Sequence, residues 1–309
     1  MSKKYDIIVL GAGPAGLCSG IYCARYGLNT LVIGKEPGGM VSETSVVENY
    51  PGFESITGAE LAKKMQNHAR ASGSDVLIYK NITELRKRDG SFEVCVDNDK
   101  FLAKTLIIAL GTERRKLNIS GEKELSGKGV SYCVTCDGPL YKDKTTAVIG
   151  GRNAAVTAAL FLAKKCKKVY LIYRRNKLRS DKILTERVVN EKRIEIIYNS
   201  NPLLINGNNA VESIAIDQKG NKKDLKVDGV FIEIGAVPAT ELVTKFLKIK
   251  INGNGQIDVN PNMSTNVEGV FAAGDITNGS NNLWQISTAV GEGAIAANSA
   301  FKYIKGIKY

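Results

Sequence analysis

The stretch YDIIVLGAGPAG (residues 5–16) decides the fold. Its apolar half, residues 5–10, is typical of a buried parallel strand, and apolar residues at helical spacing follow as far as Tyr26. Between them stands G-x-G-x-x-G. Its first glycine permits a tight turn, its second lets a pyrophosphate approach the backbone, and its third packs helix on strand. The stretch therefore predicts a βαβ unit that binds a dinucleotide at the start of its helix.

A second unit of this kind begins at Thr145, with an apolar strand over 146–149, the glycine turn GGRN (150–153) and a helical stretch. The chain therefore reads as an α/β protein with two Rossmann-like, three-layer domains. Short breaks near 112–116 and 235–240 are candidate hinges, and they predict that the second domain is inserted into the first. The predicted domains are residues 1–113 with 237–309, and residues 114–236.

Acidic residues are expected where a dinucleotide presents its sugar hydroxyls. The stretch GVFAAGD (269–275) is an apolar strand that delivers Asp275 at its carboxyl end, where ligands of α/β sheets bind. A helix cap is the alternative role for this residue. At the end of the second strand, where a ribose ligand is usual, Gly34 stands instead, and Glu36 is the candidate two residues on.

The stretch YCVTCDG (132–138) carries the chemistry. A C-x-x-C at a helix start allows a small disulfide ring, and a helix N-terminus lowers a thiol pKa. Zinc would need two more ligands, and the sequence offers only His68 and isolated cysteines, so we expect no metal site. A redox pair is therefore favoured over a zinc site or a purely structural disulfide. Asp137 is placed either to exchange a proton with a thiol or to stabilise the helix start.

These motifs together resemble the low-molecular-weight thioredoxin reductases, class II members of the FAD-dependent pyridine nucleotide-disulfide oxidoreductases. The resemblance runs over nearly the whole chain. It is carried by GAGPAG (11–16), GG (38–39), VENYPGF (47–53), CVTCD (133–137), RR (174–175), GVFAAGD (269–275), Gln285 and TAVGEG (288–293).

The resemblance implies a thioredoxin-disulfide reductase and likewise a homodimer. Electrons would pass from NADPH to FAD, then to the Cys133–Cys136 disulfide, and on to thioredoxin or a glutaredoxin-like protein. Cys136 would lie nearest the flavin and form an adduct with it, Cys133 would attack the partner disulfide, and Asp137 would be the acid and base. The middle domain, 114–236, would bind NAD(P)H and swing between two orientations. The predicted FAD residues are Gly11, Gly13, Pro14, Ala15, Gly16, Glu36, Gly38, Gly39, Met40, Thr44, Asn49, Ile82, Ala109, Gly111, Gly274, Asp275, Trp284, Gln285 and Ile286.

Two of these positions depart from the family pattern. Met40 stands where the family often has Gln, and Trp284 stands where it often has Arg. The indole has two interpretations: it stacks on an aromatic ring of the cofactor, or it belongs to the core or to an interface.

The second glycine turn also departs, because Arg152 replaces the middle glycine and crowds the expected pyrophosphate site. Arginines after the second strand nevertheless suit a 2′-phosphate, so NADPH is the predicted donor. The predicted NADP residues are Gly150, Gly151, Arg152, Asn153, Ala154, Arg174, Arg175 and Arg179. The alternatives are a reduced deazaflavin (F420H2) or ferredoxin as donor, as in archaeal and clostridial relatives with degraded second turns, or a flavin redox sensor without turnover.

The composition of the chain narrows the classes of partner and location that we expect. The chain has 309 residues and a net charge of +12, which reads as a lysine-rich surface or as attraction to acidic partners. The charge is spread out and no nucleic-acid-binding motif is present, so no nucleic acid is expected. Apolar runs are strand-length, so no membrane span is expected. Four of the six cysteines are isolated, as in a reducing compartment, and we expect a cytoplasmic enzyme.

Overall fold

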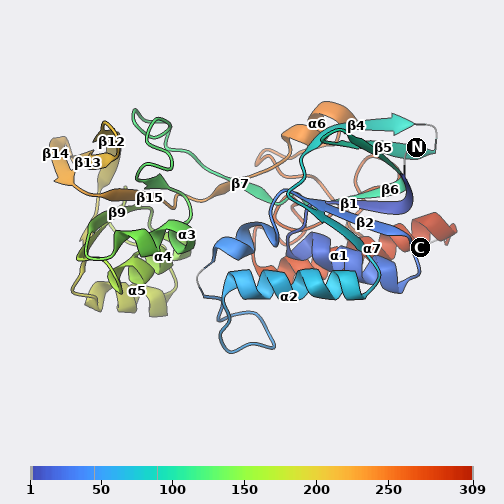
Figure 1. Cartoon of the computed structure of the whole chain (residues 1–309), viewed down its shortest axis with the longest axis horizontal. Helices are drawn as coiled ribbons and strands as arrows, with labels where there is room; N and C mark the ends of the chain where they lie inside the picture. The colour runs from blue at the N-terminus through green and yellow to red at the C-terminus, as the bar shows by residue number, and fades with distance from the viewer. Residues whose placement is uncertain (1–2, 45, 89, 308–309) are drawn as a thin grey trace. The chain divides into compact units, whose positions relative to one another are not determined.

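The computed structural model describes residues 3–44, 46–88 and 90–307. The chain divides into two compact units: unit 1 takes Met1–Glu113 and Val237–Tyr309, and unit 2 takes Arg114–Ala236. The chain passes between them at β7 (Thr112–Arg114) and β16 (Ala236–Pro238), which pair with each other as a two-stranded sheet (Figure 1). The segments expected as breaks therefore contain two short paired strands.

Unit 1 is built on a seven-stranded sheet in the order β3-β2-β1-β6-β5-β4, with β17 beside β6. β1, β2, β3, β6 and β17 run parallel, whereas β4 and β5 are antiparallel additions. Its elements are β1 (Lys3–Leu10), α1 (Pro14–Arg25), β2 (Thr30–Gly34), η1 (Gly39–Glu43), α2 (Gly58–Ala71), β3 (Asp75–Ile78), β4 (Ile82–Arg88), β5 (Ser91–Val96), β6 (Asp99–Ile108), α6 (Glu241–Leu247), β17 (Val270–Ala272) and α7 (Ile286–Lys305).

The core of unit 1 follows from the alternation of side chains along β1. Ile7 and Val9 point into the cluster beneath α1, α2 and α7, whereas Ile8 and Leu10 point into the cluster on the opposite face, which includes Val243 of α6. These four residues of β1 are fully buried. Helices thus cover both faces of the sheet, and the predicted three-layer α/β class is confirmed (Figure 1).

Unit 2 repeats this plan around the parallel sheet β11-β10-β9-β15-β8, and an antiparallel sheet β12-β13-β14 is added. Its elements are β8 (Val130–Ser131), α3 (Val134–Asp137), η2 (Gly138–Tyr141), β9 (Thr145–Ile149), α4 (Asn153–Ala163), β10 (Lys168–Ile172), α5 (Lys182–Asn190), β11 (Ile194–Ile197), β12 (Ser200–Gly207), β13 (Val211–Gln218), β14 (Asn221–Lys226) and β15 (Gly229–Ile232). Among the helices of the described residues, none has the length and apolar character that crossing a membrane requires.

Candidate functional site

The glycine turn of unit 1 lies between β1 and α1, and its three glycines differ in how much space surrounds the Cα atom. Gly11 has φ +115°, and a Cβ on it would collide with the Ala109 carbonyl. A Cβ on Gly16 would collide with the Gly11 carbonyl. At Gly13, however, the nearest atom to an ideal Cβ is the Gly38 carbonyl oxygen, 3.9 Å away. The protein therefore leaves space at Gly13, which suits a ligand that approaches this backbone.

The start of α1 offers donors to such a ligand. Gly13 is its N-cap, no side chain caps it, and its first turn contains no acidic residue. The first N–H groups of the helix are therefore available to a phosphate. This unfilled space beside available amides is what the pyrophosphate of FAD requires, so the residues present fit that cofactor.

Two distant segments meet this turn. The Gly38 N–H donates to the Ala12 carbonyl at 2.9 Å, and an ideal Cβ on Gly39 would lie 3.4 Å from Gly13 Cα. Gly274, with φ +84°, lies against Ala15, because an ideal Cβ on it would be 2.9 Å from the Ala15 Cβ. The two predicted cofactor motifs of unit 1 are therefore brought together at the start of α1.

Asp275 follows Gly274 and has an unusual environment. Burial, and then the negative charge of Glu292, raise its pKa to about 6. Glu292 on α7 is itself buried, and its Oε2 accepts from the Gly274 N–H at 2.7 Å and from the Thr277 hydroxyl at 2.8 Å. Sequence reasoning assigned no role to Glu292. The available signal was an acidic residue between two glycines, G-E-G, on the buried side of the last helix.

The start of α7 is tied to the loop before α2. Asn49 Nδ2 donates to Gln285 Oε1 at 2.9 Å, and Gln285 forms a capping box with Thr288. The neighbouring Trp284 has a buried indole N–H with no hydrogen-bond partner in the described parts of the chain. An unpaired buried donor is costly, so this N–H is a further position that a bound cofactor would satisfy.

The remaining predicted FAD residues are placed as follows. Met40 lies in η1, where its sulfur accepts from the Thr112 hydroxyl at 3.1 Å. Ile82 begins β4 and is half-buried against the apolar cluster that includes Ile8 and Leu10. Glu36 is exposed. The others flank these elements: Pro14, Thr44, Ala109, Gly111 and Ile286.

In unit 2, Cys133 and Cys136 form a disulfide, with their Cα atoms 5.4 Å apart. Cys133 is the N-cap of α3, and its sulfur accepts from the Cys136 N–H at 3.2 Å. Val134 is buried in the cluster that contains α4, and this anchors the short helix. Asp137 ends α3 one residue after Cys136, which is exposed. Cys136 thus lies at the surface of unit 2, whereas Cys133 and Asp137 are half-buried.

The second glycine turn retains the backbone shape of the first. Arg152, the N-cap of α4, has φ −105° and ψ −177°, close to the −78° and −176° of Gly13. Its side chain is exposed, so it does not strain the turn. Gly150 has φ +146°, and Gly151 lies against the ring of Tyr173, where a Cβ would collide. The turn therefore accepts arginine sterically.

A group of four arginines surrounds this turn: Arg152, Arg174, Arg175 and Arg179. All four side chains are exposed, and within the described ranges none makes an ion pair or a hydrogen bond. The Arg179 N–H donates to the Gly151 carbonyl at 2.7 Å, which holds that segment against the turn. Asn153 is instead committed to Asp181, with two hydrogen bonds of 2.8 and 2.9 Å. The arginines, rather than Asn153, are available to an anion.

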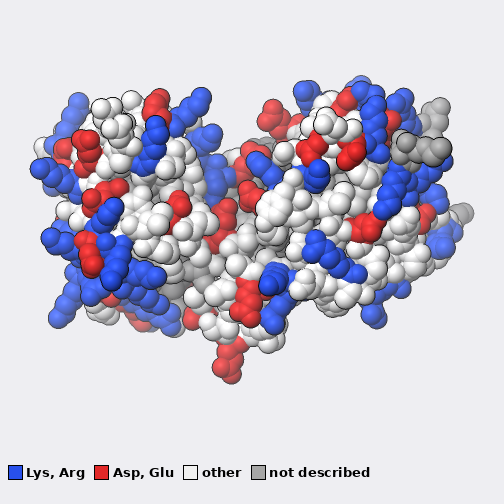
Figure 2. All heavy atoms as spheres, in the orientation of Figure 1, with Lys and Arg blue, Asp and Glu red and all other residues white. Residues whose placement is uncertain are grey.

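The positive charge of the chain is concentrated in unit 2. Residues 114–236 hold 24 of the 43 Lys and Arg residues but 13 of the 31 Asp and Glu residues, so unit 2 carries +11 and unit 1 carries +1. Figure 2 shows Lys and Arg crowded over the part of unit 2 that contains α5. The unit with the disulfide is therefore the one that attracts anions.

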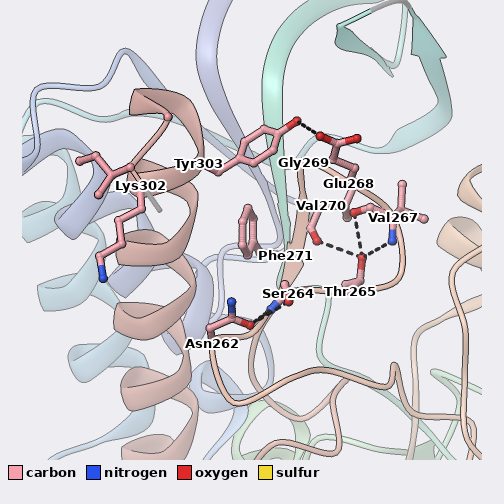
Figure 3. A pocket seen from close by; sticks show the side chains of 12 residues that line it. Asn262, Ser264, Thr265, Val267, Glu268, Gly269, Val270, Phe271, Lys302 and Tyr303 are labelled. Atoms are coloured by element: carbon pink, nitrogen blue, oxygen red, sulfur yellow. Dashed lines mark hydrogen bonds between the residues drawn. The ribbon is translucent and has the colours of Figure 1, made fainter. Parts of the chain in front are cut away.

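A surface pocket of about 460 Å³ lies elsewhere in unit 1, where β17 begins and α7 ends (Figure 3). Phe271 and Tyr303 meet edge to face at 6.3 Å there, and the Tyr303 hydroxyl donates to Glu268 at 3.4 Å. Gly274 and Asp275 follow the other end of β17. This pocket is therefore separate from the glycine turn.

Comparison with known proteins identifies relatives over the full length. The model of the family described as pyridine nucleotide-disulphide oxidoreductase matches residues 5–293. The thioredoxin reductase of Bacillus subtilis is 40% identical over 99% of this chain and 96% of its own. A 34.2 kDa protein in the rubredoxin operon of Clostridium pasteurianum is 41% identical over 98% of both chains. The solved thioredoxin reductase of Lactococcus lactis has TM-score 0.93 and 35% identity, covering 98% of this chain and 99% of its own.

Proposed function

The chain belongs to the pyridine nucleotide-disulphide oxidoreductase family, and from this premise we propose that it is an FAD-dependent thioredoxin-disulfide reductase. One observation carries the proposal: the C-x-x-C disulfide followed by Asp137 occurs in a chain that also holds an open glycine turn fitted to a dinucleotide. Full-length similarity to thioredoxin reductases supports the same reading.

In this proposal FAD binds unit 1, with its pyrophosphate at the Gly13 backbone and the start of α1. Asp275 accepts a hydrogen bond from a sugar-alcohol hydroxyl, and the Trp284 N–H finds its partner on the cofactor. Bound FAD supplies a two-electron relay between a nicotinamide donor and a disulfide.

The chain's own residues perform the exchange with the protein substrate. Two electrons and two protons convert the Cys133–Cys136 disulfide to a dithiol, and Cys133 reacts as its thiolate. The Cys133 thiolate then attacks the thioredoxin disulfide and forms a mixed disulfide, and the leaving sulfur takes a proton that Asp137 is placed to deliver. The Cys136 thiolate next attacks Cys133 Sγ, which releases dithiol thioredoxin and restores the original pair.

We also propose NADPH as the donor, bound to unit 2. Arg152, Arg174, Arg175 and Arg179 have uncommitted guanidinium groups around the second glycine turn, and guanidinium binds phosphate through paired hydrogen bonds. Arg152 in this role contacts phosphate with its side chain, where a glycine would offer only backbone. Its position in the turn is also the observation that keeps a deazaflavin or ferredoxin donor as the second candidate.

Anaerobic rapid mixing distinguishes these donors. The purified FAD-bound protein is mixed with NADPH, with NADH, with reduced deazaflavin or with reduced ferredoxin, and the loss of flavin absorbance is followed. We expect NADPH to bleach the flavin at a rate that supports turnover. Bleaching by ferredoxin or deazaflavin alone would replace the donor, and a sensor would show no donor that sustains turnover with thioredoxin.

The assembly and the compartment are proposals as well. We propose a homodimer in the cytoplasm; the four other cysteines, Cys18, Cys23, Cys95 and Cys166, are buried free thiols, which supports a reducing compartment. Light scattering of the FAD-bound protein tests the dimer, and a mass of one chain would reject it.

A further inference from the structure

A buried carboxylate of unit 2, Glu122, lies outside the sites described so far. Glu122 is 4% exposed. Its Oε1 accepts from the Leu117 N–H at 2.8 Å and from the Tyr132 hydroxyl at 2.6 Å, and its Oε2 accepts from the Asn118 N–H at 2.6 Å. Within the described residues no cation pairs with Glu122, and its three short hydrogen bonds offset the cost of burying the carboxylate.

The partners of Glu122 connect two functional places. Tyr132 directly precedes Cys133, whereas Leu117 and Asn118 follow closely after Arg114, where the chain enters unit 2. Glu122 therefore joins the entry segment of unit 2 to the residue between β8 and the redox pair.

Ser131, the residue before Tyr132, also makes hydrogen bonds next to the redox pair. Ser131 is buried at the end of β8, and its hydroxyl accepts from the Cys133 N–H at 3.0 Å and donates to the Cys133 carbonyl at 3.3 Å. The backbone at Cys133 is thus held locally by Ser131, and the Tyr132 side chain is held through Glu122.

We propose that Glu122 is a positioning residue for the Cys133–Cys136 pair, which it serves by fixing Tyr132 to the entry segment of unit 2. The proposal rests on the proposed function only in that the pair is redox-active. The tendency of two thiols to form a disulfide depends on how closely they are held, which is an effective concentration. When Tyr132 is held less firmly, the effective concentration of the two thiols falls, so the disulfide is reduced more easily.

Glu122→Gln is the direct test. The amide keeps one acceptor oxygen but turns an NH₂ donor toward an N–H or a hydroxyl, so at least one of the three hydrogen bonds is lost. Tyr132→Phe removes only the hydroxyl and leaves both amide bonds. Glu124→Gln is the matched control, because Glu124 is exposed two residues away.

The readout is the equilibrium of the FAD-bound protein with glutathione, in which two glutathione thiols reduce the pair and become one glutathione disulfide. Protein thiols are trapped by alkylation and counted by mass. For Glu122→Gln we expect the equilibrium constant of disulfide formation to fall about tenfold, which is about 30 mV for this two-electron couple. For Tyr132→Phe we expect about a threefold fall, and for Glu124→Gln no change.

An unchanged constant in a folded Glu122→Gln protein would overturn the proposal, as would an equal shift in Glu124→Gln. If Glu122→Gln does not fold, Tyr132→Phe decides alone, and a wild-type constant there overturns the proposal. Thioredoxin reduction by the wild-type protein is measured separately. Its failure would reject the proposed function, whereas the glutathione equilibrium would still test Glu122.

Discussion

Asp275→Asn should stabilise the FAD-free protein and lower its affinity for FAD. Burial and the charge of Glu292 raise the pKa of Asp275 from 3.8 to about 6, so the folded protein binds this proton more tightly than the unfolded chain. Ionised Asp275 therefore costs the folded state free energy, and stability falls as pH rises from about 4 to about 6. A difference of about two pKa units corresponds to about 3 kcal/mol at higher pH.

Urea unfolding of the FAD-free wild type and of Asp275→Asn measures this difference. Because asparagine is neutral and of the same size, the variant should gain up to about 3 kcal/mol at pH 8 and roughly half of that at pH 5. Asp99→Asn, at an exposed aspartate of the same unit, should show no such pH dependence. FAD titration should give about tenfold weaker binding to Asp275→Asn, because a charged acceptor is lost. A gain that is equal at both pH values, or a loss of stability at pH 8, would refute the reasoning about burial.

Three further predictions concern the two glycine turns and the redox pair. Gly13→Ala should leave the unfolding midpoint of the FAD-free protein unchanged but lower its affinity for FAD at least tenfold. Gly16→Ala should lower the unfolding midpoint itself, because its Cβ would collide with the Gly11 carbonyl. Equal midpoints for the two variants would contradict the assigned roles. Arg174→Ala with Arg175→Ala should reduce the preference for NADPH over NADH by about tenfold or more, measured as a ratio of kcat/KM, and an unchanged ratio would place the 2′-phosphate elsewhere. Cys136→Ser should abolish thioredoxin turnover, since Cys133 then has no partner thiol to resolve the mixed disulfide, and retained turnover would exclude the pair as the route.

Local patterns were sufficient to predict the parts of the fold in which neighbours in sequence are neighbours in space. The strand, the glycine turn and the helix at residues 5–25 form such a unit, and they are β1, the turn after it and α1. The sheet β12-β13-β14 was not predicted, because Pro202 lies inside its first strand and its third strand is polar and exposed.

The site was predictable where a motif has a physical reason of its own, as the glycines of the turn and the cysteines do. The contact between Asn49 and Gln285 joins residues 236 positions apart, and only the family resemblance pointed to either of them. Glu122 and Glu292 were missed because their value comes from the donors that the fold brings to them. Those donors are the Leu117, Asn118 and Gly274 N–H groups, which come from other parts of the chain.

The central claim is that this chain carries electrons from NADPH to a protein disulfide through Cys133 and Cys136. The most direct measurement is the anaerobic release of thioredoxin thiols by a catalytic amount of the FAD-bound protein with NADPH as the sole reductant. We expect two thiols for each NADPH consumed in the wild type and none in Cys133→Ser. NADPH consumption without thiols, or thiol release that survives Cys133→Ser, would contradict it.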